Sequence, residues 1–193
     1  MPPIQSDWAP ALVAATTIVA PDWNARVSAD RLLPATMRRD LGDHAIVLDD
    51  RVCPATGETI EHVVLVPTGV WVLDLTSGQP HNSKSSFGFA RRSARDSYLD
   101  GRNRGKLVGP VQRQRDLVAS AVERTNLGLV PVRGAVCFDD SDSPRFGGTG
   151  DTNGVLVGYS RSVVQRMRRG GLLSDDDVLG LAHRLVHELP PAT

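Results

Sequence analysis

Residues 60–75 read IEHVVLVPTGVWVLDL, and this segment decides the fold. Two runs rich in β-branched and aromatic residues flank a Pro-Thr-Gly break, which is typical of a β-hairpin. The ionisable side chains of the segment are Glu61, His62 and Asp74. A carboxylate on a half-buried strand costs free energy unless it pairs with a cation or binds a metal. The two acids are therefore the first candidates for a functional site.

The register of the hairpin decides whether the two carboxylates meet. We predict a two-residue loop of Thr68 and Gly69, because such loops need a positive φ, which glycine supplies. Glu61 and Asp74 then lie diagonally on one face of the sheet, within reach of one cation. A loop one residue longer would turn one strand over, and His62 would face Asp74 instead.

The hairpin resembles the signature hairpin of the nuclease-related domain (NERD) family, which is itself similar to the PD-(D/E)XK, restriction-endonuclease-like group. In that family the hairpin reads Ile-Asp-His-Val-Val, then a glycine turn, then an apolar strand that ends in Glu-x-Lys. The resemblance implies that Glu61 and Asp74 are metal ligands, with Mg²⁺ as the cofactor of an active enzyme. It also implies a lysine at position 76, where this chain has Thr76.

The resemblance extends beyond the hairpin. It implies that Asp30 corresponds to an acid on an early helix, although Pro34 follows and an ordinary acid at a helix N-terminus is the alternative. It also implies that Gln114 belongs to the site, because the family carries a glutamine in the helix after the hairpin. Residues 131–138, which read PVRGAVCF, are similar to a strand of the family.

The implied catalytic set departs from the family in ways that weaken hydrolysis. Its acids each differ by one methylene from the usual residue, and catalytic geometry tolerates little displacement. Thr76 has no charge, and the loss of one preorganised donor typically costs on the order of 100- to 1,000-fold in rate. We therefore predict a nuclease-related domain with a degenerate active site. The implied catalytic set is Asp30, Glu61, Asp74, Thr76 and Gln114.

Three alternatives stay open. Glu61 and Asp74 could be ordinary strand-end acids held by neighbouring arginines. The chain could also be an active Mg²⁺- or Mn²⁺-dependent DNA nuclease in which Lys84, Lys106 or an arginine replaces the missing lysine. Finally, it could be a non-enzymatic protein-interaction domain in which the former site is only structural.

Charge is unevenly distributed, although the chain has a formal net charge of zero. Residues 84–115 hold nine Lys and Arg against two Asp and Glu, whereas residues 1–83 hold five against ten. Such a basic block is where a polyanion would bind, and a solvated basic loop is the alternative. We predict nucleic acid as the partner, with DNA favoured. The candidate contacts are Arg91, Arg92, Arg95, Arg102, Arg104, Lys106, Arg113 and Arg115.

The pattern of elements predicts a single α/β domain with a mixed central sheet flanked by helices, of the restriction-endonuclease-like type. The domain is expected over residues 25–193, after an N-terminal arm over residues 1–24. Besides the hairpin, strands are expected at 45–49, 130–138 and 155–159, and residues 139–154 are expected to form a loop. One helix is expected within residues 25–41, starting or kinking at Pro34. Others are expected over 106–125, after Ser160 as N-cap and after Ser174 as N-cap.

The remaining features bear on compartment and metal binding. Cys53 and Cys137 fit neither a disulfide framework nor zinc-ligand spacing, so we expect two packed, reduced thiols. The apolar run 11–20 is too short to span a membrane and lacks a preceding basic segment, so we expect a cytoplasmic protein without membrane contact. His183 and His187 are four residues apart and could bind a metal, but surface positions on an amphipathic helix explain them better.

Overall fold

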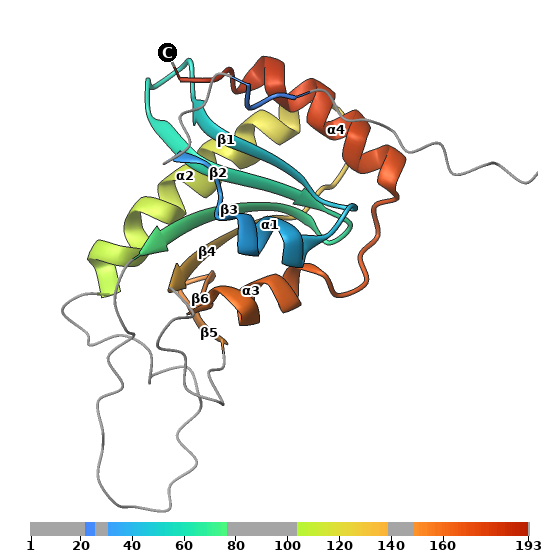
Figure 1. The fold of residues 1–193 in the computed structure, drawn as a ribbon. Helices are drawn as coiled ribbons and strands as arrows, with labels where there is room; N and C mark the ends of the chain where they lie inside the picture. The colour runs from blue at the N-terminus through green and yellow to red at the C-terminus, as the bar shows by residue number, and fades with distance from the viewer. Residues whose placement is uncertain (1–21, 26–30, 77–103, 139–148, 193) are drawn as a thin grey trace, which may run out of the picture.

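The structure is a computed structural model that describes residues 22–25, 31–76, 104–138 and 149–192 (Figure 1). Six strands form one sheet in the order β1-β2-β3-β4-β6-β5. The first three strands pair antiparallel, β3, β4 and β6 pair parallel, and β5 returns antiparallel on β6. The strands are β1 (Ile46–Val52), β2 (Thr59–Val66), β3 (Gly69–Thr76), β4 (Val132–Phe138), β5 (Thr149–Thr152) and β6 (Val155–Tyr159).

Helices cover both faces of this sheet, which gives three layers (Figure 1). One face packs against α2 (Arg104–Arg124) and α4 (Asp175–Glu188). The other face packs against α1 (Ala35–Leu41) and α3 (Ser160–Met167). The mixed sheet flanked by helices confirms the predicted α/β class.

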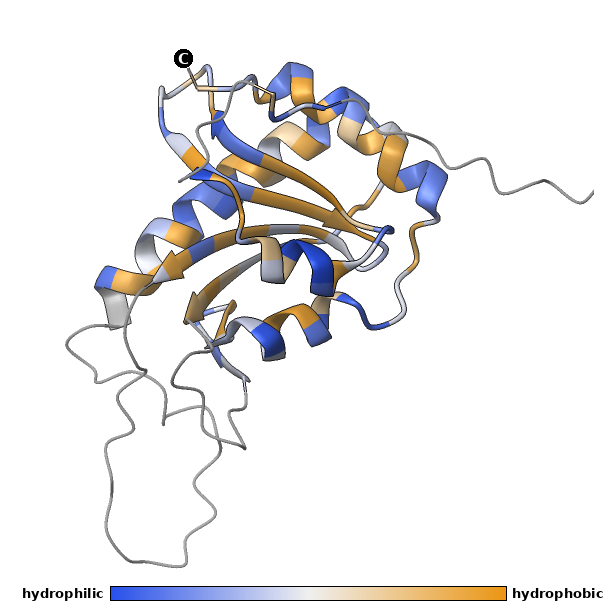
Figure 2. Cartoon of the chain, viewed as in Figure 1, coloured by the Kyte–Doolittle hydropathy of each residue, from blue (hydrophilic) through white to orange (hydrophobic). Residues whose placement is uncertain are grey.

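The hairpin strands are apolar on both sides because both sides are covered. Along β2, Val63 and Leu65 belong to the core under α2 and α4. The alternate residues Val64 and Val66 belong to the core under α1 and α3. Figure 2 shows the result as central strands that are almost continuously hydrophobic. The apolar hairpin therefore supplies residues to both cores.

The turn between β2 and β3 differs from the sequence prediction. Val66 pairs with Gly69, so the two-residue loop is Pro67–Thr68 rather than Thr68–Gly69. Proline fits the loop because it has no N–H to donate to a neighbouring strand. Gly69 has a φ of +121°, and a Cβ there would lie 2.3 Å from the carbonyl oxygen of Pro131. Glycine is thus needed for this close packing, at the first position of β3.

The prediction of a loop over residues 139–154 is wrong at its end, where β5 forms. Asn153 and Gly154 make the tight turn into β6, with φ values of +53° and +78°. Positive φ at both positions is characteristic of the twisted turn that Asn-Gly favours in two-residue hairpins. The side chain of Asp151 accepts a hydrogen bond of 3.1 Å from the N–H of Gly154. The remaining residues of that stretch, 139–148, lie outside the described part of the chain.

One predicted helix cap is confirmed and the other is wrong. Ser174 and Asp177 exchange the two hydrogen bonds of a capping box at the start of α4. Ser160, however, is the first residue of α3, and Tyr159 is its N-cap. The hydroxyl of Ser160 donates to the carbonyl oxygen of Phe138, 2.9 Å away, so it joins α3 to the end of β4 instead.

The outer edge of β1 is covered by two distant segments. Asn24 donates from its side-chain amide to the Val47 carbonyl (2.8 Å) and accepts from the N–H of Asp49 (3.0 Å). Farther along the strand, the N–H of Val52 donates to the Pro190 carbonyl at 2.9 Å. These bonds satisfy backbone groups that an edge strand would otherwise expose. They also carry β1 to Val52, past the predicted end at residue 49.

Cys53 and Cys137 are both buried, reduced thiols, as predicted. Within the described residues, no helix combines the length and hydropathy needed to span a membrane.

The loop that joins α3 to α4 packs closely on the β2–β3 turn. A Cβ on Gly171 would lie 1.8 Å from the carbonyl oxygen of Pro67. The same carbonyl accepts a hydrogen bond of 3.1 Å from the N–H of Leu173. On the other side of the turn, the Thr68 hydroxyl donates to the Met167 carbonyl at 2.9 Å. The turn is therefore held by the end of α3 and by the residues that follow it.

Gly171→Ala is expected to lower the free energy of unfolding by about 1–3 kcal/mol, because the added methyl group overlaps a backbone carbonyl. Gly170→Ala is the matched control, since nothing lies within 4 Å of a Cβ at that position. Its expected effect is within about 0.5 kcal/mol or slightly stabilising. Urea denaturation of both variants measures the difference, and equal stability of the two would contradict this close packing.

Candidate functional site

The two predicted acids lie on one face of the hairpin. The pairing of His62 with Leu73, continued by one residue, places Glu61 of β2 opposite Asp74 of β3. Asp74 follows Val72 by two residues, and Val72 packs in the core under α2 and α4. Because side chains alternate along a strand, both acids face this side of the sheet. The shift in pairing is by two residues, so it preserves the shared face that the sequence predicted.

The pKa of Asp74 is affected by Glu61, the acid opposite it. The pKa of Asp74 is raised above its ordinary value of 3.8, first by burial and then by the negative charge of Glu61. His62 opposes the shift and lowers that pKa. Within the described residues, neither Glu61 nor Asp74 forms an ion pair with an arginine or lysine. The alternative of strand-end acids held by arginines therefore has no partner there, and Asp74 faces the like charge of the solvent-exposed Glu61.

Gln114 of α2 lies at the same end of β2. Its side-chain amide donates a 3.1 Å hydrogen bond to the carbonyl oxygen of Thr59, two residues before Glu61. The bond ties the helix to the start of the strand that carries the acid. The resemblance assigned Gln114 to the site. In the structure this residue contacts the backbone next to the site and so helps to position Glu61.

Thr76 is the last residue of β3 and follows Asp74 by two residues. Alternation places it on the same side of the strand as Asp74. It is half-buried and also borders a cleft of about 520 Å³ that lies between α1 and α3, on the other face of the sheet. Its hydroxyl brings no positive charge to the acid pair. The candidates Asp30 and Lys84 lie outside the described residues.

The structure describes part of the predicted basic block. Lys106 and Arg113 are exposed on α2. Arg115, also on α2, is paired with Asp116 at 2.7 Å, so its charge is locally compensated. Arg104 begins α2. The predicted contacts Arg91, Arg92, Arg95 and Arg102 lie outside the described part of the chain.

The donor set decides which metal the acids could hold. Among the described residues, no three His, Cys, Asp or Glu side chains gather as a metal site. Mg²⁺, however, commonly uses one or two carboxylates and completes its octahedron with water and substrate phosphates. The two carboxylates of Glu61 and Asp74 match that kind of site in the number and type of protein ligands. His183 and His187 are exposed on α4, and the ring of His183 meets the edge of Trp23 with centroids 5.3 Å apart.

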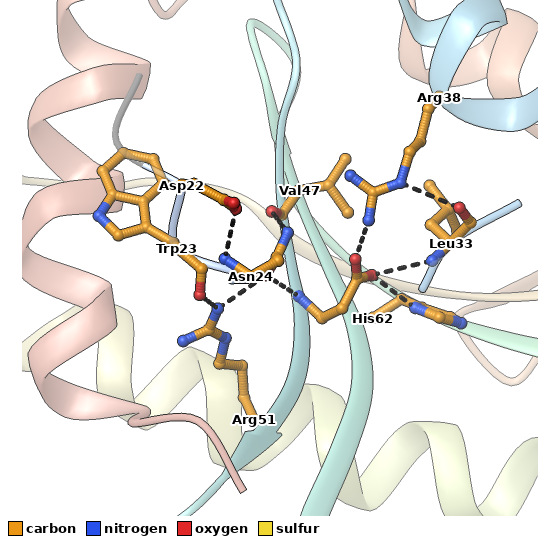
Figure 3. A network of polar contacts seen from close by, with 9 residues as sticks. Asp22, Trp23, Asn24, Leu33, Arg38, Val47, Arg51 and His62 are labelled. Carbon is orange, nitrogen blue, oxygen red and sulfur yellow. Dashed lines mark hydrogen bonds and ion pairs between the residues drawn. The ribbon is translucent and has the colours of Figure 1, made fainter. Parts of the chain in front are cut away.

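A buried polar network lies on the opposite face of β2, and the sequence analysis missed it (Figure 3). Its centre is Asp49, which is fully buried and accepts from the ring Nδ1 of His62 at 2.8 Å. The N–H of Leu33 at 3.2 Å and the guanidinium of Arg38 also donate to this carboxylate. Burial lowers the pKa of His62, and its Nδ1 donates to the Asp49 carboxylate. The network anchors β2 at the residue next to Glu61.

Asp74→Asn is expected to raise the melting temperature at pH 7, because it removes an unpaired charge that burial and Glu61 both disfavour. Because the pKa is raised in the folded state, the charged Asp74 carboxylate destabilises the folded protein, and this destabilisation is complete at pH values above that pKa. The gain should therefore shrink as pH falls through the raised pKa and vanish below about 3.8, the ordinary value. Thermal melts of variant and parent between pH 3 and pH 7 measure it, and a lower melting temperature at pH 7 would contradict a disfavoured charge at Asp74.

Comparison of the chain with protein-family models, with curated proteins and with solved structures finds no match in any of the three.

Proposed function

We propose that this chain is a nuclease-related domain that binds nucleic acid and has a degenerate hydrolytic centre. The observation that carries the proposal is the placement of Glu61 and Asp74 on one face of adjoining strands, where their charges interact. The absence of charge at Thr76, two residues beyond Asp74, supports the degenerate part of the proposal. The mixed sheet with helices on both faces is compatible with a restriction-endonuclease-like fold, which we include in the proposal.

The chemistry explains why such a centre would bind better than it cuts. Phosphodiester hydrolysis needs oxygen ligands for a divalent ion and positive charge where negative charge develops in the transition state. Glu61 and Asp74 would hold Mg²⁺, which when bound supplies an activated water and charge neutralisation. Gln114 would keep β2 aligned with α2 through Thr59. Thr76 leaves the second positive charge missing, so we expect slow cleavage.

The proposed partner follows from the exposed cations of α2. Lys106 and Arg113 continue the basic block into the described helix. Duplex DNA has a dense row of phosphates, and each neutralised phosphate releases counterions. Binding should therefore weaken steeply as salt rises.

A fluorescence-anisotropy titration of labelled duplex DNA at several KCl concentrations tests the binding. Lys106→Gln with Arg113→Gln is expected to reduce the slope of log K against log salt by about 0.9 for each phosphate that the variant no longer neutralises. If the unmodified chain shows no binding even at low salt, nucleic-acid binding is excluded and a protein-interaction domain becomes the better explanation.

Thr76→Lys tests the missing charge directly. The variant is expected to nick plasmid DNA with Mg²⁺ up to about 100- to 1,000-fold faster than the parent, because it restores one preorganised cation. Thr76→Gln is the uncharged control of similar length and should stay at the parental rate. The gain must disappear when Asp74→Ala is added.

Two results would contradict a degenerate centre. Rapid cleavage by the parent that Asp74→Ala abolishes would favour the active nuclease with a relocated cation. A Thr76→Lys variant that folds and binds DNA but cleaves no faster would show that the acids do not form a hydrolytic site.

A further inference from the structure

The helix α3 presents a basic ridge on the face of the sheet away from the acid pair. Residues 160–171 contain four arginines and no acid. The buried side of α3 consists of Val163, Val164 and Met167, which pack in the core shared with α1. The arginines therefore occupy the exposed side. They are Arg161, Arg166, Arg168 and Arg169.

Two hollows flank this ridge. The first, of about 490 Å³, lies between α1 and α3. Its charged lining consists of Arg161, Arg168, Arg169 and Asp40. The second, of about 300 Å³, lies between α3 and the sheet, and its charged lining consists of Arg133, Arg166 and Asp151. Together the hollows hold five arginines against two aspartates, so their combined formal charge is +3.

The arginines come from both ends of α3 and from a strand. Arg161 lies in the first turn of α3, and Arg166 lies in its last turn. Arg133 comes from β4 and is held by Trp71, 5.5 Å from the ring centroid, and by a 2.6 Å hydrogen bond to the Thr68 carbonyl. Cations from two elements thus gather on this ridge.

We propose that this surface, the α3 ridge with its two hollows, binds the phosphate backbone of nucleic acid. The inference rests on the proposed function and adds a second contact surface to α2. Guanidinium groups suit phosphates because they donate paired hydrogen bonds in a fixed plane. Arg161 and Arg168 are seven residues apart, about 10 Å along a helix axis, which equals the length of about three base-pair steps along a duplex axis.

The shape and polarity of the ridge favour nucleic acid over an anionic membrane. Helices that lie on a membrane insert large apolar side chains between the lipid headgroups. Among the described residues, the exposed large hydrophobic side chains are Leu127, Leu129 and Leu172. None of them lines either hollow. A backbone that follows a ridge between two basic hollows fits these features better than a flat lipid surface does.

The test compares two double variants of the full chain that remove the same charge. Arg168→Gln with Arg169→Gln removes two cations from the ridge. Arg124→Gln with Arg184→Gln removes two cations on the other face that the protein itself engages, since Arg124 pairs with Glu188 at 2.5 Å and Arg184 donates to the Thr125 carbonyl at 2.5 Å. Anisotropy titrations of labelled duplex DNA over a KCl series give the salt slope, and thermal melts establish that each variant is folded. The ridge variant should bind more weakly, with a slope smaller by about 2, and the control should keep the parental slope.

The outcomes separate this inference from the proposed function. If the ridge variant keeps the parental slope while Lys106→Gln with Arg113→Gln lowers it, the ridge is not a contact surface but DNA binding stands. If the unmodified chain binds no DNA, both proposals fail. If the ridge variant loses binding to phosphatidylserine vesicles and not to DNA, the surface is a lipid contact and the inference is overturned.

Discussion

The pairing register of β2 with β3 is the constraint on which the rest of the molecule depends. Both strands are buried on both faces, so a slip by one residue would exchange the side chains of the two cores. Val63 would leave the α2 side and Val64 would leave the α1 side. The same slip would separate Glu61 from Asp74. One set of backbone hydrogen bonds therefore determines both the packing of the domain and the geometry of the candidate site.

Local patterns predict much of the fold. The hairpin, the α4 capping box and the central strand β4 follow from alternation, capping chemistry and a dense apolar run. The strand β5 is not predicted because Gly150 and Asp151 at its centre have low strand propensity, although the Asn153–Gly154 turn signal is present. Ser160 is not the N-cap, because its hydroxyl donates instead to the carbonyl of Phe138, the last residue of β4.

Part of the candidate site can be predicted from the sequence, for a physical reason. Glu61 and Asp74 are on adjoining strands, so parity alone predicts a shared face. The Asp49 network cannot be predicted in this way. Its partners Arg38 and His62 lie 11 and 13 residues away in the chain and contact Asp49 only in the folded protein. The hollows beside α3 likewise require α1 and the sheet to be in place. Nuclease ancestry and nucleic-acid binding remain predictions.

The covered edge of β1 has a consequence for how this domain behaves among copies of itself. Open strand edges recruit foreign strands, and this is a common route to aggregation. Here Asn24 closes one part of the edge and residues 190–192 close the next. At the far side of the described sheet only the four-residue β5 is available for such growth. Removal of residues 190–192 would uncover part of β1 and leave backbone groups there open to pairing with strands of other copies.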